Sequence, residues 1–357
     1  MNTKLKFLLA AIFTCILSYN AFAQTDFAVG EITVINLGDG RLLFRTLKGD
    51  KPIEGEHRII DGRRSEYILA QFSKGMYDGK YEVYKYSKLV EKGAYKDGAR
   101  DGTFTEYYSD GAVKSEKTFT NGKLNGMLKT YFTNGKPEVE QGYKNGVEDG
   151  IERRWHWETG KLIVDAKYAD GRPDGKQIRH ISSNVGDYVE VSNYVKGVQT
   201  GEFSQTWTNG KVRIQGEYKD GKKDGVWLEY RKDGKTEKSI AYKNGERNGE
   251  YKTFFTDGTV EKIENYIDGQ REGISKEFFY DSGNLKAEYN YANNVKEGKY
   301  KMYYDDGTLR EEGRFEDGRE VYRKEYYKNG KVKEISERNS RGQWETIESY
   351  SDDGKQK

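Results

Sequence analysis

The order of apolar, polar and glycine positions repeats along almost the whole chain. Aromatic and aliphatic residues alternate with polar ones in short runs, and each run ends at an Asn-Gly or Asp-Gly pair, as in EYKDGKKDGVWLEYRKDGK at 217–235. Alternation with a period of two indicates β-strands. Asn-Gly and Asp-Gly suit two-residue type I′ turns, because both central residues of such a turn need positive φ. The pattern therefore predicts a series of β-hairpins.

Each unit of the repeat begins with a glycine and is 23–26 residues long. The glycines are Gly55, Gly79, Gly102, Gly126, Gly150, Gly175, Gly201, Gly225, Gly249, Gly273 and Gly298. A further unit begins near Val321 without its glycine, and a weaker one begins at Gly30. Internal repetition on this scale is typical of repeat architectures. We expect an all-β fold, an elongated single-layer antiparallel β-meander of about a dozen hairpin repeats.

The unit that starts at Gly225 carries a family resemblance. It contains GVWLEY at 225–230, DGK at 233–235 and YKNG at 242–245, and the next unit starts at Gly249. These residues resemble the MORN repeat in its longer bacterial variant. The resemblance implies a twisted sheet built from hairpins, and a role in contacts with proteins or membranes. Similar bacterial proteins are often labelled antitoxin components of toxin–antitoxin pairs, which act in the cytoplasm.

A two-residue turn at Asp233-Gly234 would place Arg231 opposite Thr236. The same count pairs Tyr108 with Val113, Phe132 with Pro137, Trp157 with Leu162, Trp207 with Val212, Phe255 with Val260, Tyr280 with Leu285, Tyr304 with Leu309 and Tyr327 with Val332. Alternation of side chains adds further aromatic residues to this face, namely Phe104, Phe203, Trp227, Tyr251, Tyr300, Phe119, Tyr218, Tyr242, Tyr266 and Phe315. We expect this face, the ladder face, to hold the sheet together through cross-strand aromatic pairs.

A second stripe of side chains is predicted on the opposite face, three residues before each first-turn Asp or Asn. It contains Tyr107, Tyr131, His156, Thr206, Tyr230, Phe254, Phe279, Tyr303 and Tyr326. Aromatic residues among charged neighbours are typical of partner-binding surfaces. Curvature of the sheet over the stripe would instead make it a second small core, and the sequence leaves both interpretations open. The hypothetical partner-binding residues are Tyr107, Tyr131, Tyr230, Phe254, Phe279, Tyr303 and Tyr326.

The chain divides into four segments. Residues 1–23 have the layout of a secretory signal peptide, with Lys4 and Lys6, a short apolar run and the ending Ala21-Phe22-Ala23. Cleavage after Ala23 is favoured over a lipoprotein site at Cys15. Residues 24–54 are expected to form an N-terminal capping segment or a degenerate repeat, 55–335 the repeat array, and 336–357 a C-terminal cap or tail. A leader of this kind predicts the periplasm or cell envelope of a Gram-negative bacterium, or secretion.

The units from Gly150 to Lys196 depart from the pattern. They contain RRWHWETG at 153–160 and IRHISSNVGDYVEV at 178–191. A specific contact site would explain the departure, and so would drift in an array that tolerates insertions at its loops.

Composition and charge exclude several functions. Without residues 1–23, Lys plus Arg falls from 61 to 59 and equals the 59 Asp plus Glu, so no basic excess indicates nucleic-acid binding or membrane contact. Charged residues make up 34% and the mean hydropathy is -1.00, yet 14% aromatic residues argue against disorder. The mature chain also has no cysteine.

No catalytic constellation stands out in the sequence. The only GK[ST] sequence, at 234–236, lacks the P-loop glycine five residues before Gly234, where Glu229 stands. The three histidines, His57, His156 and His180, are far apart in sequence. We expect no enzyme activity, no catalytic residue, no cofactor and no metal. The favoured function is that of an exported binding or scaffold protein with a protein partner, and the alternative is an antitoxin-like protein. Carbohydrate binding by stacked tyrosines stays open.

Overall fold

The computed structural model describes residues 25–357, so the expected signal peptide at 1–23 lies outside the described residues. The chain divides into two compact units, unit 1 up to Leu124 and unit 2 from Asn125 to Lys357. Each unit is described by itself.

Unit 1 is a sheet of antiparallel strands in chain order from β4 to β10, joined by one parallel strand, β1, which pairs with β4. Strands β2 and β3 form a separate hairpin. The elements are β1 (Thr25–Ala28), the 3-10 turn η1 (Val29–Glu31), β2 (Ile32–Asn36), β3 (Leu42–Thr46), β4 (Gly55–Asp61), β5 (Glu66–Ser73), β6 (Met76–Lys85), β7 (Lys88–Lys96), β8 (Ala99–Arg100), β9 (Gly102–Tyr107) and β10 (Val113–Thr120).

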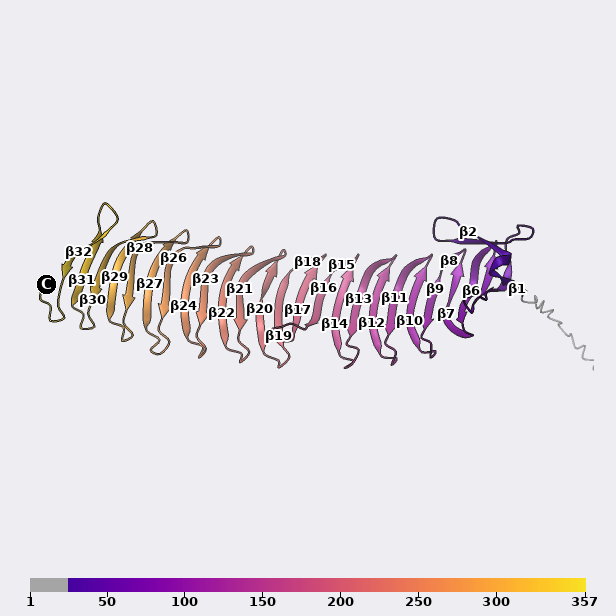
Figure 1. The fold of residues 1–357 in the computed structure, drawn as a ribbon, viewed down its shortest axis with the longest axis horizontal. Coiled ribbons are helices and arrows are strands. Elements are labelled where there is room, and N and C mark those ends of the chain that lie inside the picture. Colours follow the sequence, from indigo (N-terminus) through magenta and orange to yellow (C-terminus); the bar gives the residue numbers. More distant parts are fainter. Residues whose placement is uncertain (1–24) are drawn as a thin grey trace, which may run out of the picture. The chain divides into compact units, whose positions relative to one another are not determined.

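Unit 2 is a single antiparallel layer in which successive strands lie side by side in chain order (Figure 1). Its strands are β11 (Lys123–Tyr131), which begins at the boundary, β12 (Pro137–Lys144), β13 (Val147–Trp155), β14 (Leu162–Ala169), β15 (Arg172–Pro173), β16 (Gly175–Ile181), β17 (Tyr188–Val195), β18 (Val198–Gln199), β19 (Gly201–Trp207), β20 (Val212–Lys219), β21 (Lys222–Tyr230), β22 (Thr236–Lys243), β23 (Glu246–Phe254), β24 (Val260–Ile267), β25 (Gln270–Arg271), β26 (Gly273–Phe278), β27 (Leu285–Ala292), β28 (Val295–Tyr303), β29 (Leu309–Glu316), β30 (Arg319–Tyr326), β31 (Val332–Arg338) and β32 (Trp344–Ser349). The predicted all-β hairpin meander is confirmed.

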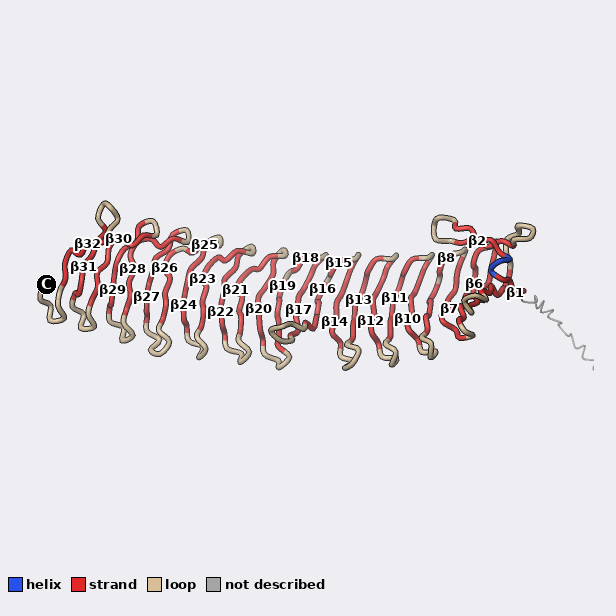
Figure 2. Tube along the Cα trace, viewed as in Figure 1, coloured by secondary structure: helices blue, strands red, loops and turns tan. Residues whose placement is uncertain are grey.

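Two kinds of turn alternate along the chain, and in unit 2 they line opposite edges of the layer (Figure 2). The second turn of each unit is the expected type I′, since Asp220 and Gly221 have φ of 51° and 78°. The first turn is different, because in Asp233-Gly234 only the glycine has positive φ, at 91°. Arg231 N donates to Lys235 O and Gly234 N donates to Arg231 O, both at 2.9 Å. This is a type I turn closed by a left-handed glycine, so the expectation of type I′ geometry was wrong for the first turns.

The longer first turn changes the pairing at the tip of each hairpin. Tyr230, rather than Arg231, lies opposite Thr236, and a bulge follows because Glu229 pairs with Lys238. The bulge restores the expected register in the body of the hairpin, where Trp227 faces Ile240. The predicted tip pairs were therefore wrong, whereas aromatic residues predicted for the body of the ladder face, such as Trp227 and Tyr218, do pack together there.

A bulge also explains the glycine that begins each unit. The pairing of β20 with β21 shifts between Gln215 and Glu217, and Gly225 lies in the extra loop of backbone on β21 with φ of 68°. Residues other than glycine rarely adopt a positive φ of this size. The repeat period is therefore set by a backbone requirement at the bulge.

The aromatic side chains of the ladder face stack from hairpin to hairpin. The ring of Trp227 lies 5.4 Å from Phe203 and 5.1 Å from Tyr218 between centroids, and Trp227 is 2% exposed. Gly216 makes this possible, because a Cβ there would lie 2.3 Å from the indole. Equivalent contacts join Tyr251 to Tyr266 at 6.0 Å and Tyr300 to Phe315 at 5.1 Å.

The N-terminal part of unit 1 covers one end of its own ladder face. Phe44 of β3 packs on Phe72 and Tyr77, with ring centroids 5.3 and 4.6 Å apart. Ile53 is 2% exposed in the same cluster. Main-chain hydrogen bonds from Phe44 N to Gly75 O and from Gly75 N to Ile53 O, at 2.6 and 3.0 Å, fix the segment to the β5–β6 turn. The β2–β3 hairpin and Ile53 thus add a local second layer.

Candidate binding surface

The register places the predicted stripe residues opposite small or aliphatic side chains. Six of the seven partner-binding candidates have such partners: Tyr107 with Val113, Tyr131 with Pro137, Tyr230 with Thr236, Phe254 with Val260, Tyr303 with Leu309 and Tyr326 with Val332. Directly opposed residues of an antiparallel pair project to the same face. These aliphatic residues therefore belong to the stripe, and assigning them to the ladder face was wrong. We use "stripe" below for both members of these pairs.

Phe279 does not occupy the predicted position. Phe278 pairs with Leu285 and takes the place that Tyr230 has in its own hairpin. The reason is a first turn one residue longer, since Phe279 N donates to Asn284 O and Gly283 N donates back to Phe279 O. The same extra residue puts Trp155, not His156, opposite Leu162. A stripe residue therefore cannot be located by its distance in sequence from the first turn wherever the length of that turn changes.

The tyrosines of the stripe are half-buried and anchored by their neighbours on the same face. The hydroxyl of Tyr230 accepts a hydrogen bond from Gln215 Nε2 at 3.0 Å, and that of Tyr326 donates to Glu312 Oε1 at 2.6 Å. Burial, and then the hydrogen bond to the Glu312 carboxylate, raise the pKa of Tyr326 above its ordinary value. The rings are thus held in fixed positions while one side of each stays open to solvent.

Nothing in unit 2 covers the stripe. All strands of unit 2 belong to the one layer. The cluster of buried apolar residues described in this unit, which contains Phe203, Trp227 and Ile240, lies on the ladder face. The described part of unit 2 therefore contains no second core around the stripe.

A row of charged side chains runs beside the stripe on the same face, two residues closer to the second turns along each first strand, as Lys301 is to Tyr303. Its pairs in unit 2 include Lys129 with Glu140, Arg153 with Asp165, Lys276 with Glu288 and Lys301 with Glu312. Arg153 lies 3.4 Å from Asp165, and Lys276 lies 3.4 Å from Glu288. An aromatic band bordered by ion pairs has the composition of a protein–protein interface, in which aromatic residues form the centre and charges the rim.

The residue before each repeat glycine has a structural role that the sequence analysis missed. The carboxylate of Glu297, just before Gly298, accepts a hydrogen bond from Asp317 N in the following second turn at 2.9 Å. Asp101 does the same for Asn121 N at 3.2 Å and Asp224 for Asn244 N at 3.4 Å. The frequent Asp-Gly or Asn-Gly at the start of a unit was the available signal. These acids stabilise the second turns.

Three further observations concern metal ligands, membrane-spanning helices and a histidine. Among residues 25–357, no three His, Cys, Asp or Glu side chains gather closely enough to bind a metal ion. No helix in the described part of the chain is long and apolar enough to cross a membrane. The ring nitrogens of His57 contact the main-chain oxygens of Thr25 and Glu54, at 3.0 and 2.7 Å.

The architecture defines a β-hairpin repeat protein, and a comparison with family models identifies the repeat. Six segments match the model described as "MORN repeat variant", at residues 100–121, 124–145, 247–268, 272–293, 296–317 and 319–339. The chain therefore contains repeats of the MORN variant. Repeats of this kind indicate a binding or scaffold role. No match was found among curated proteins.

Solved structures show only distant similarity. The chain matches "Crystal Structure of TcdB2-TccC3-TEV" at 12% identity with a TM-score of 0.18, over 82% of this chain and 18% of that chain. It matches "Crystal Structure of TcdB2-TccC3" at 11% identity with a TM-score of 0.13, over 88% of this chain and 23% of that chain. The chain thus spans less than a quarter of either protein.

Proposed function

We propose that this protein is an exported, non-enzymatic binding or scaffold element of a bacterial cell envelope, and that it contacts a protein partner through the stripe. The observation that supports this most strongly is the open aromatic and aliphatic band of unit 2, where Tyr303 faces Leu309 and Tyr326 faces Val332 with no layer above them. Large exposed apolar patches are uncommon on soluble monomers unless a partner covers them. The signal-like sequence at 1–23 supports export.

The test is a pull-down from envelope fractions with the mature protein and a double variant, Tyr303→Ser with Tyr326→Ser. We expect the variant to lose a partner that the wild type retains. A matched control is Tyr280→Ser, because Tyr280 is 51% exposed and lies in a first turn outside the stripe. Equal recovery of the partner by all three proteins would refute the role of the stripe.

The same experiment separates the other candidate activities. An antitoxin-like protein would yield one stoichiometric complex with a toxin, recovered from the cytoplasm. Carbohydrate binding would appear on a glycan array and would survive removal of proteins from the extract. N-terminal sequencing of the secreted or periplasmic form tests export, and we expect it to begin at Gln24.

A further inference from the structure

The charged row of unit 2 is interrupted by six uncharged residues. Cross-strand pairing connects, in order, Ile178, Val191, Ser204, Gln215, Leu228 and Ser239. On one side the row continues with Asp165, which faces Ile178, and on the other with Lys252, which faces Ser239. We call these six uncharged residues, which lie on strands β16 to β22, the neutral window.

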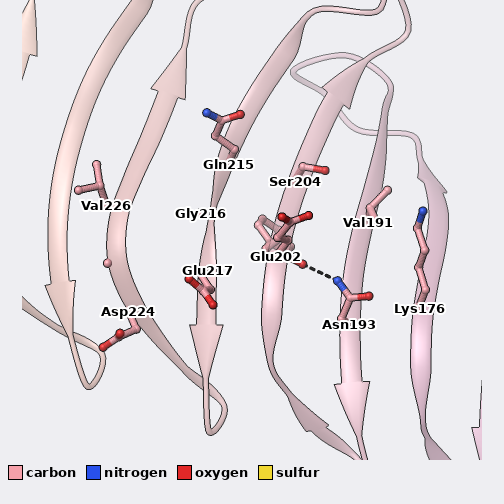
Figure 3. Close-up of a pocket in the computed structure, with 12 residues that line it drawn as sticks. Lys176, Val191, Asn193, Glu202, Ser204, Gln215, Gly216, Glu217, Asp224 and Val226 are labelled. Carbon is pink, nitrogen blue, oxygen red and sulfur yellow. Dashed lines mark hydrogen bonds between the residues drawn. The ribbon is translucent and has the colours of Figure 1, made fainter.

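The stripe is also reduced beside the window. His180 faces Val189, and Thr206 faces Val212, so neither position has the Tyr or Phe found in most other hairpins. A hollow of about 620 Å³ lies over strands β16 to β21, and Figure 3 shows residues that line it, among them Val191, Ser204 and Gln215 of the window. Val226 at its border is 58% exposed. The hollow therefore lies over Val191, Ser204 and Gln215 of the window and extends from there toward the second turns.

Three carboxylates line the side of the hollow nearest the second turns. Glu202 lies opposite Glu217, and Glu217 lies opposite Asp224. Like charges directly opposed across strands are destabilising. None of the three forms an ion pair within residues 25–357, although Asp224 accepts the hydrogen bond from Asn244 N. Lys176, at the far side of the hollow, is the one cation among the residues that line it.

From this arrangement we infer that the neutral window is the docking site for an extended segment of a partner protein that carries a lysine or arginine beside apolar side chains. The inference rests on the proposed function and specifies its partner. A cation between Glu202 and Glu217 relieves their repulsion, while the apolar side chains cover Val191 and Val226. Six strands at about 4.8 Å spacing cover about 24 Å, which matches about seven residues of extended chain.

The test uses the full mature protein and random heptapeptides displayed on phage. We expect the enriched peptides to contain a Lys or Arg next to apolar residues, and one such peptide is then synthesised with a fluorophore for anisotropy titration. The double variant Glu202→Gln with Glu217→Gln should weaken its binding at least tenfold. The variant should fold, because it removes a repulsion. Added NaCl should weaken the wild-type complex, since exposed charge pairs are screened by salt.

A second variant gives the window the charges found elsewhere in the row. Ser204→Lys with Gln215→Glu creates a cross-strand pair like Lys301 with Glu312, and we expect it to abolish peptide binding without lowering the melting temperature. Ile263→Glu, in the same row outside the window, faces Lys252 and Lys276. It is the control and should bind like wild type. Enrichment of acidic or uncharged peptides, or unchanged affinity in both double variants, would overturn the inference. It would leave the pull-down with Tyr303 and Tyr326 variants unaffected, so the two proposals can fail separately.

Discussion

Two blocks of unit 2 share one backbone design but differ in what they bury. In the block from 201 to 316, the second residue after the repeat glycine is aromatic in most units, as in Phe203, Trp227 and Tyr300. In the block from 126 to 195 the same position holds Leu128, Glu152 and Gln177. Glu152 and Gln177 are nevertheless 4% and 2% exposed, so the polar block buries polar groups where the aromatic block buries rings.

The polar block replaces ring contacts with directed interactions. Arg154 lies 2.6 Å from the Glu152 carboxylate, and Arg179 lies 3.9 Å from it. Gln177 Nε2 donates to Lys167 O at 2.8 Å. The hairpins continue through the block without a break, so turns and cross-strand hydrogen bonds suffice to maintain the fold. The ladder residues then determine how stable each hairpin is.

The largest expected difference between the blocks comes from truncating the ladder. Trp227→Ala should destabilise its hairpins by about 3–5 kcal/mol, the usual range for a buried large aromatic residue. Leu128→Ala at the equivalent position should cost about 1 kcal/mol, because that side chain is already half-exposed. Hydrogen exchange followed by mass spectrometry measures both losses locally, and equal losses would contradict the distinction between the blocks.

A smaller effect concerns the acid Glu264, which is buried in the aromatic block. Burial raises the pKa of its carboxyl, but hydrogen bonds from Lys262 and Tyr266, both at 2.9 Å, together with Arg271, lower the pKa below the ordinary value of 4.5. A lowered pKa contributes stability at pH values above the ordinary one, and this contribution is lost as pH falls through the folded-state pKa.

Glu264→Gln should therefore cost about 1–2 kcal/mol at neutral pH and show a weaker acid destabilisation than wild type. Urea unfolding at pH 7 and pH 3 measures both effects. Glu261→Gln is the control, at an exposed acid three residues away in the same strand. A parallel pH dependence in wild type and Glu264→Gln would show that the ion pairs do not stabilise this block.

The smallest expected effect is a gain in the polar block. Gln177 Oε1 is buried without a hydrogen-bond partner among the described residues, and an unsatisfied buried polar atom is costly. Gln177→Met should leave stability unchanged or raise it by up to about 1 kcal/mol, because it removes this atom and keeps the volume. Thermal unfolding measures the change, with Gln205→Met as a control, since Gln205 Nε2 donates to Glu190 at 2.9 Å. Clear destabilisation by Gln177→Met would mean that the polar interior is itself required.

Much of the fold was predictable because its signals are local. The Asn-Gly and Asp-Gly pairs identified the hairpins, and the alternation of side chains identified Trp227, Tyr242 and Tyr266 as members of one face. The distinction between turn types was not predictable, since Asp233-Gly234 and Asp220-Gly221 have the same letters but different φ values. Neighbouring strands decide which conformation each pair adopts.

The stripe was predicted only in part. Tyr230 and Tyr326 lie where the count placed them, whereas Phe279 does not, because its turn has one extra residue. The aliphatic partners of the stripe and the neutral window were missed. Both depend on bulges, and although a repeat glycine marks one of them, the sequence does not show how far the strand pairing shifts there.

The sequence by itself determined the repeat, the strands and the residues of the aromatic ladder, because each follows from local backbone preferences and a period of two. The tertiary structure alone decided which strands lie at which register, and so which side chains share a face. It thereby brought together Ile178, Ser204 and Leu228, which lie 26 and 24 residues apart in the chain, in one uncharged row. Contacts of this kind arise only when the hairpins pair, because pairing brings together residues that are too far apart in sequence for local backbone preferences to connect.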